Sequence, residues 1–184
     1  FQPSLANADY ERMEGLAVTS LKPVVDDIRF IVKRGIDIFG ASVGLISLSP
    51  LFLVIAISIK LTSEGSVFFT QQRHGRNRRR FGMYKFRTMV HSAEDLQPLF
   101  EDKNEVSGPV FKIKNDPRLT RIGIVLRRTS LDELPQLINV LKGEMSLVGP
   151  RPLPQRDVSR FEDGWLLRRF CVLPGMTGLW QISS

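Results

Sequence analysis

The stretch IFGASVGLISLSPLFLVIAISI, residues 38–59, holds 22 consecutive residues without a charged side chain. About 20 apolar residues in a helix cross the hydrocarbon core of a bilayer, so this length fits a membrane segment. A buried helix of a soluble protein is the alternative, although such runs are usually shorter. A signal peptide is excluded, because the stretch is internal and no small-residue cleavage pattern follows it. We therefore expect residues 38–59 to enter a membrane.

Ser49-Pro50 interrupts this segment near its middle. Proline removes a helical hydrogen bond and clashes with the preceding turn, so a kink or break is expected there. Lys33 and Arg34 precede the segment and Lys60 follows it, so both ends are basic. The positive-inside rule therefore does not predict which end of a spanning helix would lie in the cytoplasm. A re-entrant helix would keep both basic flanks on one membrane face, with arms of roughly 15 Å each. A kinked spanning helix is the alternative, since spanning helices tolerate proline.

Residues 40–44, GASVG, match the G-x-S-x-G pattern of serine nucleophiles. That pattern needs a turn between a strand and a helix and a histidine partner, whereas this copy lies inside an apolar run. Its small residues are better explained by close helix packing.

The net charge of +7 over 184 residues is concentrated in one place. Residues 73–87 carry seven Lys or Arg side chains and no acid. Such a cluster favours phosphate in nucleic acid, anionic lipid or a phosphorylated substrate, and a solvated loop is the alternative. One cysteine and two histidines exclude a disulfide within the chain and leave too few ligands for a Cys/His zinc site.

The remaining sequence predicts an α+β protein, mostly helical, with a small β-hairpin. Residues 66–72 and 81–88 are rich in aromatic and β-branched residues on either side of the basic tip, which predicts the hairpin. In a strand, Lys85 and Arg87 would share one face. Residues 24–34, 92–95, 120–128, 131–142 and 156–170 are predicted to be helical, with Gly143 as a stop, whereas residues 101–118 and 173–183 are predicted to be loops and residues 149–154 a stiff arm.

Residues 130–133, SLDE, fit a capping box with Ser130 as the N-cap and Glu133 at the third helical position. Pro135 disturbs this register, because the helix expects a backbone donor at the fifth position. With Asp132 as the N-cap, the proline would fall where that donor is not needed. Both registers place the Asp-Glu pair at the start of a helix.

The same pair is suited to phosphoryl transfer. Neighbouring helical residues point about 100° apart, so one carboxylate can attack phosphorus while the other holds a metal or moves a proton. Mg²⁺ is usually held by one or two carboxylates together with substrate phosphates. The chain has no P-loop, D-x-D pair or GxGxxG motif. Candidate phosphate partners are Lys85, Arg87, Arg118, Arg121, Arg127, Arg128 and Arg151, although most single arginines are surface residues.

Four stretches in order resemble the bacterial sugar transferases known as monotopic phosphoglycosyl transferases. They are KRGIDIFGASVGLISLSPLFLVIAI (33–57), GSVFFTQQRHGRNRRRFGMYKFRTM (65–89), RRTSLDELPQLINVLKGEMSLVGPRP (127–152) and LPGMTGLWQIS (173–183). The resemblance implies transfer of sugar-1-phosphate from a UDP-sugar to undecaprenyl phosphate with release of UMP. This is the first membrane step in the assembly of glycans such as exopolysaccharide, capsule or O-antigen.

The resemblance also implies roles for individual residues. Asp132 would be the nucleophile that forms a covalent phospho-sugar intermediate, Glu133 would assist it, and Mg²⁺ would lie close to both carboxylates. Ser49-Pro50 would break a re-entrant helix. Lys85, Arg87, Arg127 and Arg128 would meet substrate phosphates, and the element Pro150-Arg151-Pro152 would be associated with the uridine nucleotide.

The expected organisation is a linker and approach helix at residues 1–32, a re-entrant membrane helix at residues 33–62 and a cytoplasmic catalytic domain at residues 63–184. Relatives usually continue beyond GLWQIS, and long members carry an upstream region, so we expect this chain to be the catalytic part of a larger protein. The expected location is the cytoplasmic face of the bacterial inner membrane. The expected partners are the UDP-sugar, undecaprenyl phosphate and membrane lipid. A homodimer is compatible with the resemblance, and nucleic acid is not expected as a partner.

A membrane-anchored module that binds anionic lipid or nucleic acid is the competing hypothesis. It explains the basic residues 73–87 but assigns no role to Asp132 and Glu133 or to residues 150–152.

Overall fold

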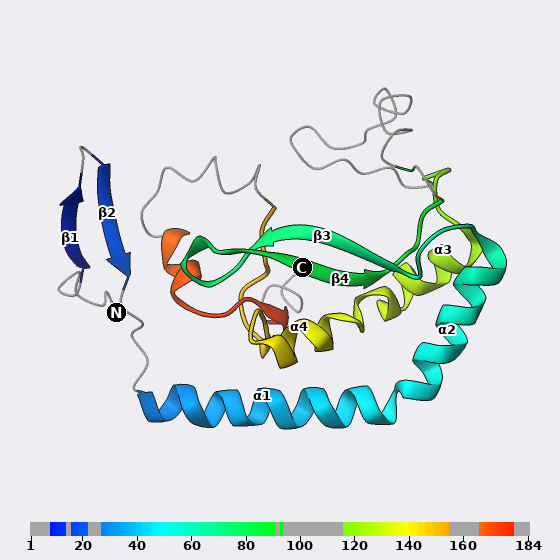
Figure 1. The fold of residues 1–184 in the computed structure, drawn as a ribbon, viewed down its shortest axis with the longest axis horizontal. Coiled ribbons are helices and arrows are strands. Elements are labelled where there is room, and N and C mark those ends of the chain that lie inside the picture. The colour runs from blue at the N-terminus through cyan, green and yellow to red at the C-terminus, as the bar shows by residue number, and fades with distance from the viewer. Residues whose placement is uncertain are drawn as a thin grey trace.

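The apolar stretch folds as two helices that meet at a sharp bend. Helix α1 spans Asp27–Ser47 and helix α2 spans Ser49–Thr62, so Leu48 alone separates them. Pro50 falls in the first turn of α2, where its missing N–H needs no partner. Figure 1 shows α1 along one side of the molecule and α2 turning away from its end. The predicted break at Ser49-Pro50 is confirmed. Of the helix predicted at residues 24–34, residues 27–34 are helical and continue into the apolar segment, and residues 24–26 lie outside the described residues.

The computed structural model describes residues 8–13, 16–21, 27–90, 93, 116–154 and 166–178. Within these ranges, no individual helix is long and apolar enough to cross a bilayer. Residues 28–47 and 49–62 meet that criterion only as a pair, bent by 60°.

Helix α1 packs closely against the rest of the chain through its small residues. Ala41 is fully buried, and a Cβ atom on Gly40 would lie 2.7 Å from Leu147 Cδ1. Asp37 is also buried and accepts hydrogen bonds from Ser146 Oγ and Leu147 N, each at 3.0 Å. The small residues therefore serve close packing, as the sequence predicted, and a buried carboxylate fixes the helix to the strand that follows α4.

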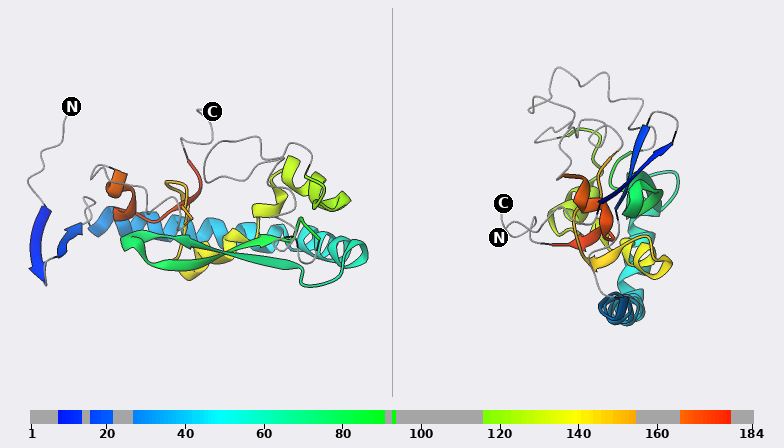
Figure 2. Two further views of the ribbon diagram at one scale, coloured as in Figure 1. Left: turned by 90° about the horizontal axis from the view of Figure 1, so that it is seen from above. Right: turned by 90° about the vertical axis from the view of Figure 1, so that its left-hand side faces the viewer.

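The predicted hairpin with a basic tip is confirmed. Strand β3 (Phe68–His74) pairs with β4 (Arg80–Phe86) in antiparallel register, with His74 opposite Arg80 and Phe68 opposite Phe86. The 3-10 turn η1 (Arg76–Arg78) forms the tip, and Asn77 and Arg78 both adopt positive φ. Figure 2 shows the hairpin running alongside α1.

The segment after the hairpin is less regular than the sequence predicted. Helix α3 spans Arg121–Arg128, and Thr120 caps it by accepting a hydrogen bond from Gly123 N. The predicted helix at 131–142 is divided into a 3-10 turn η3 (Leu131–Glu133) and helix α4 (Gln136–Lys142), which ends at Gly143 with φ of 82°. The backbone N–H that Pro135 lacks explains why the first three residues do not continue into α4.

The capping-box prediction for Ser130 is wrong. Ser130 adopts a left-handed backbone with φ of 56°, and its side chain caps nothing. A capping residue needs an extended backbone that directs its oxygen at the following N–H groups. The alternative prediction with Asp132 as N-cap is also wrong, because Pro135 occupies the N-cap position of α4.

Three further elements complete the described chain. Strand β5 (Ser146–Val148) pairs in parallel with β6 (Gly175–Thr177), so part of the predicted loop at residues 173–183 is a strand. Residues Leu166–Cys171 form the 3-10 helix η4, whereas residues 156–165 of the helix predicted at 156–170 lie outside the described ranges. The helix predicted at residues 92–95 also lies outside them, apart from Ala93.

The structure also has a β-hairpin that the sequence analysis did not predict. It consists of β1 (Ala8–Met13) and β2 (Leu16–Leu21), within the stretch interpreted as a linker. The strand sequences, ADYERM and LAVTSL, lack the strict apolar–polar alternation by which a half-buried strand is recognised.

Two apolar clusters form the core. The first joins α1, β4 and α4 through Ala41, Met83 and Val140. The second joins α2, β4 and α3 through Ile59, Phe86 and Leu126, with the Phe52 and Phe68 rings 5.1 and 5.5 Å from that of Phe86. The chain is therefore an α+β protein with small sheets, and the predicted fold class is confirmed at that level.

Candidate active site

The Asp-Glu pair lies in the short turn η3 between α3 and α4, beside the end of β4. Asp132 is only 8% exposed. Glu133 is half-buried, and its Oε1 accepts a hydrogen bond at 2.7 Å from Lys85 Nζ on β4. The hairpin thus brings a cation to the acidic pair, whereas Lys85 is expected from the sequence to meet substrate phosphate.

The environment of Asp132 differs from that of Glu133. Among the described residues, no side chain of another residue forms a hydrogen bond or an ion pair with the Asp132 carboxylate. Burial raises the pKa of this carboxyl above its ordinary value, and the charge of Glu133 raises it further, while Lys85 and Arg127 act in the opposite direction. A buried carboxylate without a fixed partner, close to two cations, can receive a ligand that carries its own positive or electrophilic centre.

Arg127 is anchored through one nitrogen of its guanidinium group. Its Nε donates to Thr88 Oγ1 at 3.0 Å, just beyond the end of β4, and the residue as a whole is exposed. Arg127 is close enough to Asp132 to lower the pKa of that carboxyl. Arg128 is exposed at the end of the same helix, and no contact of a described residue brings it to the acidic pair.

Arg87 connects the hairpin to the end of the bent helix pair. It is 8% exposed, and its Nη2 donates to both the carbonyl and the Oγ of Ser63, the C-cap residue of α2, at 2.8 Å. Its Nε and Nη1 are buried without a hydrogen-bond partner. Because β4 ends at Phe86, Arg87 lies one residue beyond the strand. The structure thus shows different partners for Lys85 and Arg87.

A buried ion pair supports the backbone next to Thr88. Arg118 donates from Nη2 and Nε to the Asp116 carboxylate at 2.7 and 2.9 Å, and both side chains are almost fully buried. Arg118 Nη1 also donates to the Ala93 carbonyl. In the sequence analysis Arg118 is a candidate phosphate partner, but in the structure its guanidinium group pairs with the Asp116 carboxylate. Thr120 N donates to the Thr88 carbonyl, so the ion pair stabilises the segment that positions Arg127.

The segment Pro150-Arg151-Pro152 lies near the other end of the hairpin. Leu153 pairs with His74, which faces Arg80 at the start of β4. Lys85 lies five residues after Arg80 along β4, which corresponds to about 16 Å of backbone. Arg151 is exposed, and its carbonyl accepts a hydrogen bond from Arg169.

The described residues include no group of three or more His, Cys, Asp or Glu side chains that could hold a metal ion. The two carboxylates of η3 still suit Mg²⁺ as part of a mixed ligand set. Asp132 has no competing partner side chain, and Glu133 uses only Oε1 for Lys85. Mg²⁺ commonly takes one or two protein carboxylates and completes its shell with water and substrate phosphates.

Sequence analysis missed Thr88, Ser63 and the Asp116–Arg118 pair. Short polar residues such as Thr88 and Ser63 carry no sequence pattern for a contact across 39 or 24 residues. In the sequence analysis, residues 116–118 lie at the end of a predicted loop, and Arg118 is assigned only as a candidate phosphate partner. No local pattern reveals that both charges become buried.

Comparison with known proteins gives a consistent result. The model of the family described as bacterial sugar transferase matches residues 28–184. The exopolysaccharide production protein ExoY of Rhizobium meliloti is 44% identical over 84% of this chain and 70% of its own length. The undecaprenyl-phosphate galactose phosphotransferase of Salmonella typhimurium is 43% identical over 85% of this chain. The UDP-glucose:undecaprenyl-phosphate glucose-1-phosphate transferase of Xanthomonas campestris is 40% identical over the whole chain.

The relatives differ in how much of their length this chain spans. It covers about two thirds of ExoY but only 33% and 37% of the Salmonella and Xanthomonas proteins. The family match extends from the start of α1 across the hairpin and the Asp-Glu turn, so it includes every part of the site described above. The chain belongs to the bacterial sugar transferase family.

Proposed function

We propose that the chain transfers sugar-1-phosphate from a UDP-sugar to undecaprenyl phosphate and releases UMP. The observation that carries this proposal is the pairing of Glu133 with Lys85, which leaves the neighbouring buried Asp132 without a partner side chain. The names of the Salmonella and Xanthomonas relatives support the same reaction, because both describe sugar-phosphate transfer involving undecaprenyl phosphate.

The proposed first step is attack by an Asp132 oxygen on the phosphorus attached to the sugar. A bond forms between the carboxylate oxygen and this phosphorus, and the bond to the bridging oxygen of the diphosphate breaks. UMP leaves with that oxygen and its electron pair. Carboxylates serve as phosphate-accepting nucleophiles in other enzymes. The low exposure of Asp132 limits access of water, which would otherwise hydrolyse the resulting acyl phosphate.

In the second proposed step, a phosphate oxygen of undecaprenyl phosphate attacks the same phosphorus. The bond to Asp132 breaks, its electron pair returns to the carboxylate, and the product is a diphosphate-linked lipid sugar. Glu133 assists at the same centre, and its ion pair with Lys85 holds it in one orientation. Arg127 supplies positive charge for the phosphoryl oxygens, and Thr88 orients it.

We propose Mg²⁺ as the cofactor, held by Asp132 and Glu133 together with donor phosphates. When bound, the ion neutralises phosphate charge. Removal by EDTA is expected to stop UMP release and added Mg²⁺ to restore it, with Glu133→Gln requiring more Mg²⁺ than the wild type. Equal Mg²⁺ dependence in both proteins would exclude Glu133 as a ligand.

We also propose which residues contact the rest of the UDP-sugar and the lipid phosphate. Arg128 and the arm Pro150-Arg151-Pro152 would meet the nucleotide, and Arg87 would meet phosphate at the membrane end of the site. Arg87 suits this role because it contacts Ser63 at the end of α2 and retains two N–H groups without partners. Substrate entry would require the surrounding side chains to shift, since both groups are buried.

We further propose that α1 and α2 form the re-entrant membrane helix. Their bend and the exposed apolar residues Phe39, Val43 and Ile46 on α1 support this arrangement. The catalytic site would then lie on the cytoplasmic face of the bacterial inner membrane, where the reaction would begin assembly of a glycan such as exopolysaccharide or capsule.

The decisive experiment is covalent labelling. The chain in detergent micelles is incubated with Mg²⁺ and a UDP-sugar that carries ³²P in the phosphate attached to the sugar. The wild type is expected to retain label after denaturation, and Asp132→Asn to retain none. Glu133→Gln is the matched control, because it changes the adjacent carboxylate and is expected to label more slowly. Full UMP release by Asp132→Asn would exclude the aspartyl intermediate.

A further inference from the structure

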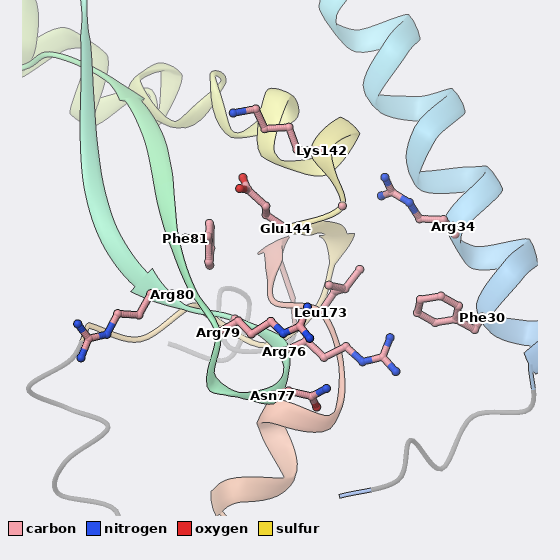
Figure 3. Close-up of a pocket in the computed structure, with 12 residues that line it drawn as sticks. Phe30, Arg34, Arg76, Asn77, Arg79, Arg80, Phe81, Lys142, Glu144 and Leu173 are labelled. Carbon is pink, nitrogen blue, oxygen red and sulfur yellow. The ribbon is translucent and has the colours of Figure 1, made fainter. Parts of the chain in front are cut away.

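A cavity lies at the end of the hairpin remote from the Asp-Glu turn. Its volume is about 470 Å³, and it opens between the first turns of α1, the hairpin tip and the end of α4. Figure 3 shows these three elements around it. The length of β4, about 16 Å between Arg80 and Lys85, separates this cavity from the proposed active site.

The lining of the cavity is strongly basic. Arg34 comes from α1, Lys142 from α4 and three arginines from the hairpin tip, against a single carboxylate, Glu144. Glu144 is already engaged, because its Oε2 accepts a hydrogen bond from Asn139 at 2.6 Å. Within the described part of the chain, no carboxylate forms a salt bridge with these basic side chains. The cavity therefore holds an uncompensated positive charge, and an anion would lower its electrostatic energy.

The cations are arranged around the opening and held there. Figure 3 shows Arg76 and Arg79 extending from the hairpin tip toward α1, while Arg80 points to the other side. Arg34 is anchored by hydrogen bonds from Nη1 and Nη2 to the carbonyls of Val140 and Leu141, at 2.7 and 3.0 Å. Arg76 Nε is buried and has no hydrogen-bond partner among the described residues. The cavity thus combines the anchored guanidinium of Arg34 with a buried N–H of Arg76 that lacks an acceptor.

An apolar surface borders the same opening. The guanidinium of Arg76 lies 5.0 Å from the centre of the Phe30 ring, which also lines the cavity. On the same turns of α1, Ile28 and Ile31 are 75% and 66% exposed. Positive charge next to exposed apolar side chains matches the boundary between lipid headgroups and acyl chains, where basic and aromatic residues are favoured.

We propose that this cavity binds the phosphate group of an anionic phospholipid. The phosphodiester would sit between Arg34, Arg76 and Arg79, and the acyl chains would lie along Ile28 and Ile31. Binding would hold the hairpin tip on the membrane surface, while the other end of the hairpin carries Lys85 to the Asp-Glu turn. This inference does not depend on the chemistry proposed for Asp132.

The test uses the purified chain in micelles of a neutral detergent. Dihexanoyl-phosphatidylglycerol is titrated by calorimetry, with dihexanoyl-phosphatidylcholine and inorganic phosphate as separate arms. Arg79→Gln removes a charge that faces the cavity. Arg78→Gln is the matched control, because it removes the same charge from the same tip at a residue that does not line the cavity and lies over Phe170. Circular dichroism confirms that each variant is folded.

We expect Arg79→Gln to weaken phosphatidylglycerol binding about fivefold, as for loss of one basic residue near an anionic surface. Arg78→Gln should change it by less than about twofold, because salt screens the more distant charge. Phosphatidylcholine and inorganic phosphate should bind much more weakly. Equal losses for the two variants would show a diffuse basic surface and overturn the proposal. Binding of inorganic phosphate as tight as that of the lipid would assign the cavity to a soluble anion and overturn the lipid assignment.

Discussion

Lys85 Nζ donates to Glu133 Oε1 at 2.7 Å and so joins strand β4 to the turn η3 across 48 residues of sequence. The two side chains are 20% and 31% exposed, which limits the solvent screening of their charges. Lys85 pairs with the carboxylate of Glu133, whereas the carboxylate of the adjacent buried Asp132 stays available to a ligand. One ion pair therefore gives two neighbouring carboxylates different environments.

The Lys85–Glu133 pair is expected to act as a unit. Lys85→Met should lower kcat for UMP release about 100-fold, a typical cost of removing one electrostatic contact at a reacting centre. Adding Glu133→Gln to Lys85→Met should cost less than the product of the two single effects, because contacting residues are not additive. Lys85→Arg is the charge-conserving control and should recover part of the rate. Independent effects in the double-mutant cycle would contradict the coupling.

Thr88 is expected to position Arg127. Thr88→Val preserves the shape of the side chain but removes the acceptor of the 3.0 Å hydrogen bond from Arg127 Nε. We expect kcat/KM for the UDP-sugar to fall about tenfold, as for loss of a hydrogen bond to a charged group. Thr88→Ser keeps the hydroxyl and should restore most of this loss. A deficit of the same size in Thr88→Ser would indicate a packing role for the threonine methyl instead.

The Asp116–Arg118 pair makes a pH-dependent contribution to stability. The hydrogen bond from Arg118 holds the pKa of the Asp116 carboxyl below its ordinary value. Because the folded-state pKa is the lower one, this contribution is present above an unfolded-state pKa of about 4 and is lost as the pH falls through the folded-state value.

At pH 7, Asp116→Asn should lower the free energy of unfolding by about 3–5 kcal/mol, because Arg118 stays buried without its partner charge. The difference from the wild type should shrink below about pH 4 in denaturant titrations. Glu64→Gln, at an exposed position, is the control and should change little at either pH. A difference that does not vary with pH would rule out the charge of Asp116 as its source.

The bend between α1 and α2 predicts the membrane topology. Single cysteines at Arg29, in the first turn of α1, and at Glu64, just beyond the end of α2, mark the two ends of the bent pair after replacement of Cys171 by serine. In sealed inverted vesicles, a re-entrant pair should expose both cysteines to a membrane-impermeant maleimide. Pro50→Ala should reduce labelling at one end, because loss of the proline favours a straight helix. Labelling of the two cysteines from opposite sides in the parent protein would establish a spanning helix.

The local elements of this fold were predictable because their signals are local. A charge-free run with Ser49-Pro50 at its centre predicts two helical arms, and β-rich flanks around a basic tip predict the hairpin. Gly143 ends α4 because a left-handed residue is needed there. The prediction failed at Ser130, where the capping pattern is present but the backbone is left-handed. It also missed β5 and β6, whose three-residue strands form only by pairing with each other.

The sequence by itself determined the family, the bent apolar segment and the adjacent pair Asp132 and Glu133, since motif order, charge and proline position are properties of the chain. Only the tertiary structure decided which carboxylate is paired. Lys85, Thr88 and Arg118 carry similar sequence signals to many surface residues, and their partners lie far away or become buried only on folding. Burial changes the energy of a charge or a polar group, and burial is set by packing of distant segments, so these roles emerge only from the folded chain.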